Sequence, residues 1–176
     1  MESILHTNRL ILREFKIDDA EFIFSLNQDP EVLQYTGDTP FFHIKEAEDF
    51  LNSYTYKSSL RLGRWIMIDK NSSTALGWCG LKLHDSGMVD LGFRLLKKHW
   101  NQGYATEAAM ACLEYGFMSC HLETIVGRVA RMNTASIRVL EKIGMKLKES
   151  GECEGIKDAL IYQMNSREYR DLKNEI

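Results

Sequence analysis

Hydrophobic and polar positions in the first third of the chain predict one strand followed by two helices. Residues 8–15 (NRLILREF) place leucines between arginines, as a half-buried strand does. Residues 17–29 begin with acidic side chains and continue with apolar residues at helical spacing, until Asp29 and Pro30 interrupt the pattern. A second helix is predicted over residues 44–57, where apolar side chains recur every three or four positions.

The rest of the chain alternates strands and helices. Strands are predicted over 64–69, 75–84, 88–96, 123–130, 145–150 and 156–164, with a tight hairpin at 85–87 and helices over 104–119 and 133–144. Helix 104–119 lies between two strands, which favours a parallel crossover. The expected fold is α/β (α+β): a single domain spanning residues 1–176, with a central, mixed, mostly antiparallel sheet flanked by helices.

Composition excludes several classes of function. The net charge of −3 provides no basic surface for nucleic acid, and no apolar run approaches the roughly 20 residues that cross a bilayer. The N-terminus lacks a secretory pattern and the four cysteines form no CxxC pair, so we expect a reduced cytoplasmic setting. Five dispersed histidines and the absence of HExxH, GxSxG and P-loop motifs predict no metal and no nucleotide hydrolysis.

The segment HWNQGYATEA, residues 99–108, is the candidate for chemistry. Its helix begins without an ordinary side-chain cap, so the amides from Gln102 to Glu107 would form an anion site suited to a pyrophosphate. Gly103 would let the backbone approach such a ligand without a Cβ in the way. The alternative is that Gly103 only allows a sharp turn from strand to helix.

Two longer segments carry a family resemblance. LGFRLLKKHWNQGYATEAAMACLEYGF, with NTASIRVLEKIGM, resembles the acetyl-CoA-binding core of the GNAT superfamily of N-acyltransferases. TNRLILREFKIDDAEFIFSLNQDPEV resembles the opening of its bacterial ribosomal-protein and peptide N-terminal acetyltransferase (Rim-type) branch. The resemblance spans about residues 7–165. The chain departs from the branch pattern at Asn101 and Gln102, where glycine and lysine are usual.

The resemblance implies how acetyl-CoA would bind, with no metal. The strand over 88–96 would end in a bulge and splay from its parallel neighbour, so that pantetheine pairs with the freed backbone. The pyrophosphate would lie on the amides of residues 102–106, and Asn133 and Ser136 would face the cofactor arm, although both also suit simple helix capping. The expected cofactor-binding residues are Phe93, Leu95, Trp100, Asn101, Gln102, Gly103, Tyr104, Ala105, Thr106, Asn133 and Ser136.

The catalytic groups are less sharply indicated. Asp90, on the strand entering the site, could deprotonate the amine through a water, or could be a solvent-facing strand residue. Family members often carry a tyrosine about seven residues after the asparagine, where this chain has Leu140. Ser136 is the substitute candidate for protonating the departing thiolate.

The expected activity is direct transfer of an acetyl group from acetyl-CoA to a primary amine, and the expected acceptor is a protein or peptide N-terminal α-amine. The first alternative is a small-amine acceptor, such as a polyamine, an aminoglycoside or an amino acid. The second is a CoA-binding module without catalysis. No nucleic-acid or membrane partner is expected, and the chain would be a monomer or a homodimer.

Overall fold

An eight-stranded sheet forms the centre of the molecule. The computed structural model describes residues 3–56, 61–153 and 156–174. Neighbouring strands run antiparallel, except that β5 and β6 are parallel. In sheet order, the strands are β1 (Leu5–His6), β2 (Leu10–Arg13), β3 (Gly63–Asp69), β4 (Ala75–Leu83), β5 (Val89–Leu95), β6 (Thr124–Ala130), β8 (Ile156–Asn165) and β7 (Lys146–Cys153).

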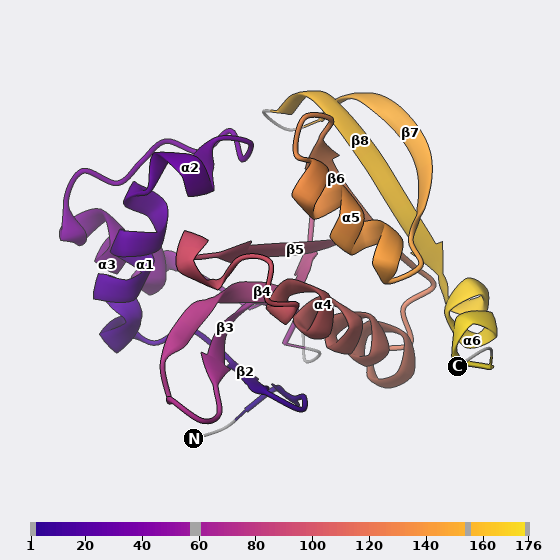
Figure 1. Cartoon of the computed structure of the whole chain (residues 1–176), viewed down its shortest axis with the longest axis horizontal. Helices are drawn as coiled ribbons and strands as arrows, with labels where there is room; N and C mark the ends of the chain where they lie inside the picture. The colour runs from indigo at the N-terminus through magenta and orange to yellow at the C-terminus, as the bar shows by residue number, and fades with distance from the viewer. Residues whose placement is uncertain (1–2, 57–60, 154–155, 175–176) are drawn as a thin grey trace.

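The helices gather in separate groups around this sheet (Figure 1). The three α-helices between residues 20 and 53 lie at one end of the molecule, and the helix over residues 134–142 lies beside the arm made by β6, β8 and β7. Within the described ranges, no helix has the length and apolar character needed to cross a membrane. The helical segments are η1 (Ile17–Asp19), α1 (Ala20–Gln28), α2 (Pro30–Leu33), α3 (Ile44–Ser53), η2 (Lys97–His99), α4 (Tyr104–Glu114), its π-helical continuation η3 (Tyr115–Ser119), α5 (Thr134–Lys142) and α6 (Ser166–Asn174).

The predicted fold class is confirmed, with differences at several element ends. Pro30 begins α2 instead of only ending α1, because proline suits the first helical position and the Asp29 side chain accepts a hydrogen bond from the Glu31 amide. The helix predicted over 44–57 ends at Ser53, and residue 57 lies outside the described residues. Strand β1 and helix α6 were not predicted, since β1 is too short to show a periodicity.

Helix α4 packs directly on the sheet through small residues. Ala108, Ala109 and Cys112 are fully buried in the core, where Trp65 of β3 is also fully buried. Small side chains let the helix axis approach the sheet closely, and close packing of this kind leaves little freedom to shift. The N-terminus of α4 is thereby held just beyond the end of β5.

The sheet opens between its two parallel strands. Strands β4 and β5 pair continuously from Val89 to Leu95, whereas β5 and β6 share one register pair, Asp90 with Val126. The expected splay is therefore present, but the bulge expected at the end of β5 is not, because its register with β4 does not shift. Figure 1 shows β6 turning away from β5. The short helix η2 redirects the chain after β5 instead.

The open edge of β5 carries backbone groups that do not bond to β4. The amide of Leu96 donates to the Leu76 carbonyl on β4. Because successive residues of a strand point their backbone groups to opposite sides, Phe93 and Leu95 direct theirs into the opening.

Candidate active site

The opening is bounded by a cavity at the N-termini of α4 and α5, which we call the loop cavity. Its volume is about 440 Å³. Its walls come from the end of α2, from β5, from the loop between η2 and α4, and from the first turns of α5. All the residues expected to bind the cofactor line it except one: they are Phe93, Leu95, Trp100, Asn101, Gly103, Tyr104, Ala105, Thr106, Asn133 and Ser136.

The exception, Gln102, is not among the residues that line the loop cavity. Its side-chain amide donates to the Lys98 carbonyl at 2.8 Å, and its own carbonyl accepts from Arg9 at 2.9 Å. Gln102 therefore shapes the loop by bonding within it, and its place as a direct cofactor contact stays a prediction that this geometry does not favour.

The N-terminus of α4 has the features of an anion site. Gly103 is the N-cap residue, with φ 81°, and no side chain caps the helix. The first amides of the helix therefore have no side-chain acceptor, and they lie at the positive end of its dipole. An anion in the loop cavity would find both the amides and the favourable potential.

Arg9 holds this loop in place through contacts that we call the brace. Its Nε lies 2.6 Å from Glu107 Oε2, and its guanidinium carbon lies 4.2 Å from the centre of the Tyr104 ring. Burial alone would raise the pKa of Glu107, but hydrogen bonds from Thr7 and Arg9 and the charge of Arg9 lower it, so Glu107 is ionised. This ion pair joins the turn between β1 and β2 to the first turn of α4.

The same brace changes the reason for glycine at position 103. A Cβ built on Gly103 would lie 3.4 Å from Arg9 Nη2, on the side of the brace. The left-handed backbone conformation, more than access for a ligand, is thus what requires glycine there.

We expect Gly103→Asn to keep most of the affinity for acetyl-CoA, within about threefold, because asparagine tolerates positive φ. Gly103→Val should lose about tenfold or more, because a β-branched residue is strained by 1–2 kcal/mol or more in this conformation. Isothermal titration with acetyl-CoA measures both. Equal losses in the two variants would show that any side chain at 103 blocks the ligand.

Two of the residues expected to contact the cofactor already form hydrogen bonds within the protein. The Trp100 indole donates to the Leu95 carbonyl at 2.9 Å, which leaves the Leu95 amide and both backbone groups of Phe93 for a ligand strand. Asn133 caps α5, its side chain accepting from the Ser136 amide at 3.1 Å. The capping alternative therefore holds, while Asn133 and Ser136 also line the loop cavity.

A second cavity, the sheet cavity, lies beside the loop cavity along β5. Its volume is about 580 Å³. Aromatic side chains form much of its wall. The guanidinium carbons of Arg64 and Arg94 lie 5.3 Å and 5.2 Å from the centre of the Trp78 ring. The aromatic lining residues are Phe15, Tyr35, Phe41, Phe50, Tyr54, Trp78 and Phe93.

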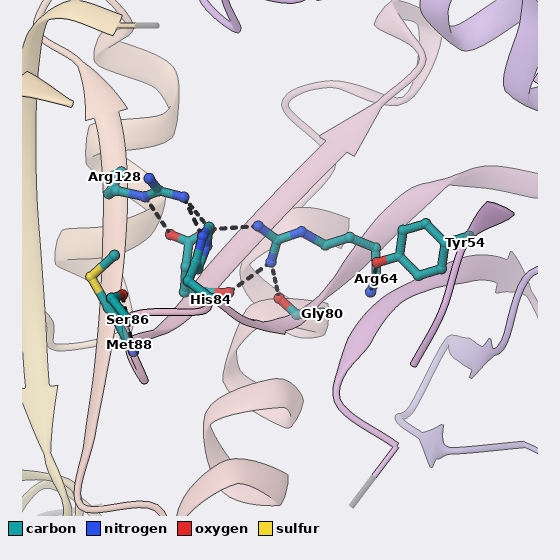
Figure 2. A network of polar contacts seen from close by, with 8 residues as sticks. Tyr54, Arg64, Gly80, His84, Ser86, Met88 and Arg128 are labelled. Carbon is teal, nitrogen blue, oxygen red and sulfur yellow. Dashed lines mark hydrogen bonds and ion pairs between the residues drawn. The ribbon is translucent and has the colours of Figure 1, made fainter. Parts of the chain in front are cut away.

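A buried ionic network lies at one side of the sheet cavity (Figure 2). Asp90 accepts from Arg64 at 2.5 Å and from Arg128 at 3.3 Å, so its carboxylate joins β3, β5 and β6. Arg64 also donates to the backbone carbonyls of Gly80 and Asp90. Figure 2 shows Arg64 and Arg128 approaching His84 from opposite sides.

These contacts bear on the expected role of Asp90. Its side chain is only 6% exposed, so it is not the solvent-facing residue of the alternative. Burial alone would raise the pKa of Asp90, but the charge of Arg64, with His84 and Arg128 beside it, holds that pKa far below its usual range. A carboxylate this weakly basic is a poor proton acceptor. Its role as general base stays a prediction against which this geometry weighs.

His84 accepts a hydrogen bond from Arg128 in this network. Its Nε2 lies 3.0 Å from Arg128 Nη2 and 3.8 Å from Asp90 Oδ2. A guanidinium can only donate, so the shorter contact makes Nε2 the acceptor, and the longer one exceeds hydrogen-bond length. Arg128 thus occupies the basic nitrogen of His84.

The two cavities meet at one ring of side chains, which we call the junction. Sequence reasoning missed half of these residues, because nothing in the sequence places the end of α2 beside β5 and α5. Arg94 is the link, donating to the side chains of Asn27 and Asp38. The residues lining both cavities are Tyr35, Thr36, Phe93, Arg94, Asn133 and Ser136.

Comparisons with known proteins agree with this geometry. The family model described as "Acetyltransferase (GNAT) domain" matches residues 9–146. The chain is 31% identical over 173 residues to p20, an uncharacterised N-acetyltransferase of Bacillus licheniformis, covering 94% of this chain and 97% of p20. It is also similar to a solved GNAT-family acetyltransferase from Bacillus anthracis, with a TM-score of 0.82, 26% identity and coverage of 93% and 98% of the two chains.

A third likeness is to the fold alone. The spermidine N-acetyltransferase of Vibrio cholerae, solved in complex with CoA and spermine, superposes with a TM-score of 0.78 at 20% identity, covering 92% of this chain and 98% of that one. With the family model matching most of the chain, the expected activity class is confirmed. The chain belongs to the GNAT family of acetyl-CoA-dependent N-acetyltransferases.

Proposed function

We propose that the acceptor is the α-amine of a protein or peptide N-terminus, which enters through the sheet cavity and meets the thioester at the junction. The observation that supports this proposal is that the carboxylates lining the sheet cavity are already paired with arginines. Among the described residues that line it, the acidic side chains are Asp38 and Asp90, and each is bonded to an arginine.

A polyamine would need a different lining. Its distal ammonium groups are charged at neutral pH and require carboxylates when they are taken out of water. The described lining instead includes Lys82, Arg64, Arg94 and Arg128, which repel such a chain. Its aromatic walls suit the apolar side chain and backbone of a peptide.

The chemistry of the nucleophile also favours an α-amine. An α-amine with a pKa near ~7.8 is roughly one-tenth neutral at pH 7, whereas a lysine amine near ~10.4 is some 400-fold less available. This difference corresponds to about 3.5 kcal/mol, which a dedicated base would have to supply. With Asp90 ion-paired and the Nε2 of His84 bonded, an acceptor that is already partly neutral fits best.

Direct transfer is supported by the position of the thiols. Cys79, Cys112 and Cys120 are buried, and none of them lines either cavity. Burial and the neighbouring Cys79 raise the pKa of Cys112, which disfavours its nucleophilic thiolate. We infer that the amine attacks acetyl-CoA without an acyl-enzyme intermediate. The cytoplasmic setting and the choice between monomer and homodimer stay predictions.

Matched peptides test the acceptor. We expect a peptide with a free N-terminus and one internal lysine to be acetylated at the α-amine, and its N-formylated counterpart to react at least 100-fold more slowly. Release of CoA thiol gives the rate, and mass spectrometry locates the acetyl group. Spermidine and an aminoglycoside are run in parallel. Faster turnover of either small amine than of any free peptide would contradict the proposal.

A further inference from the structure

The junction is where the reaction must take place. The loop cavity holds the candidate pyrophosphate site at the α4 N-terminus, and the sheet cavity adjoins it along β5. An acetyl group carried from the first and attacked from the second lies between them. Any side chain that exchanges a proton with the departing sulfur therefore belongs to the residues that line both cavities.

Three hydroxyl groups at the junction can be compared as proton donors. Thr36 donates its hydroxyl hydrogen to the Leu33 carbonyl at 3.1 Å, within its own turn. Ser136, in the first turn of α5, carries an aliphatic hydroxyl, which is a far weaker acid than a thiol. Tyr35 carries a phenol, which is a much stronger acid than an aliphatic hydroxyl.

Tyr35 is also held in place. It lies in the turn that follows α2 and is half-buried. On its C-terminal side, Asp38 bonds to Arg94, and the Phe41 amide donates to the Asn27 carbonyl at 3.1 Å. Arg94 of β5, whose side chain is only 10% exposed, thus fixes the segment that carries Tyr35 against the strand expected to hold the cofactor.

We propose that Tyr35 is the general acid that protonates the CoA sulfur as it leaves. The proposal rests on the acetyl transfer of the family and on the position of the junction, not on the identity of the acceptor. Leu140, which is 2% exposed, has no proton to give. In this proposal the general acid belongs to the turn that follows α2 and not to α5.

The step balances without a further reactant. The amine nitrogen forms a bond to the acetyl carbon, and the C–S bond breaks with its electron pair moving to sulfur. The phenol hydrogen of Tyr35 moves to that sulfur and gives CoA thiol. The amine loses one proton to water, and the Tyr35 phenolate regains one from solvent. The products are the N-acetyl amine and free CoA.

Tyr35→Phe tests the proposal because it keeps the ring and removes the proton. We expect kcat to fall about 100-fold, at the lower end of the usual range for general acids because a thiolate is a tolerable leaving group. The KM for acetyl-CoA should change less than about threefold. The acceptor is whichever amine the wild-type protein acetylates fastest, so a wrong acceptor assignment would leave this comparison intact.

A second donor separates a catalytic role from a structural one. The selenium analogue of acetyl-CoA releases a selenolate, a weaker base than a thiolate, which needs no proton to leave. With this analogue the deficit of Tyr35→Phe should shrink to within about threefold of wild type. An equal deficit with both donors, or a change confined to KM, would overturn the proposal. So would the same donor-dependent loss in Ser136→Ala with none in Tyr35→Phe.

Discussion

Ala105→Glu is expected to lower the affinity for acetyl-CoA by more than 100-fold while leaving the fold intact. Ala105 is the second residue of α4 and lines the loop cavity. If a carboxylate there came within about 5 Å of a bound phosphate, the two charges would repel by about 3 kcal/mol at an effective dielectric constant near 20. The new carboxylate also competes for the same helix amides.

The opposite effect on the free protein makes this prediction specific. An acidic residue in the first turn of a helix stabilises it by about 0.3–1 kcal/mol, so the melting temperature without ligand should hold or rise. Ala105→Gln is the matched control, with the same bulk and no charge. Isothermal titration measures the two affinities. If the glutamate and glutamine variants bind acetyl-CoA within threefold of each other, the pyrophosphate does not lie on these amides.

Asp90→Asn should destabilise the protein by about 3–5 kcal/mol. The substitution removes the negative charge shared by Arg64 and Arg128, whose side chains are 13% and 12% exposed. Removing one partner of a buried ion pair leaves an uncompensated charge away from water. For a chain of this length the melting temperature should fall by about 6–20 °C, as measured by calorimetry.

Asp158→Asn is the control, because it breaks an exposed pair. Arg131 Nε and Asp158 Oδ1 lie 3.0 Å apart, and their side chains are 49% and 64% exposed. The loss of stability should therefore be no more than about 1 kcal/mol. Similar losses in the two variants would show that the Asp90 network adds no special stability.

Lowering the pH should reduce the difference in the free energy of unfolding between wild type and Asp90→Asn. The pKa of Asp90 is lowered in the folded state, so its carboxylate stabilises the protein fully above the unfolded value near ~3.9. That contribution is lost as the pH falls below this value towards the folded pKa. Urea denaturation from pH 7 to pH 3 measures the change.

Local geometry explains which parts of the site could be predicted from sequence. The loop around Gly103 is one contiguous segment, so its turn, helix start and amides follow from neighbouring residues. The same holds for Asn133 and Ser136, which form an N-cap three residues apart. These residues also carry the family resemblance, and the structure places them on one cavity.

The missed residues depend on contacts between distant segments. Arg94 reaches Asp38 across 56 positions, and Arg9 reaches Gln102 across 93. Asp90 was assigned to the right strand, but a one-dimensional pattern could not show that Arg64 and Arg128 surround it. Helix α6 was missed for a similar reason: its sequence is strongly polar, and Tyr169 is its buried residue.

The single register pair between β5 and β6 has a thermodynamic consequence. A sheet interrupted at this seam lacks the cross-strand bonds that would otherwise join its two portions into one cooperative unit, and regions with fewer such bonds open at lower free energy. A cofactor arm paired with β5 in this seam, as predicted, would supply those bonds only while it is bound. The free energy of unfolding therefore increases with the acetyl-CoA concentration [L], by RT ln(1 + [L]/Kd).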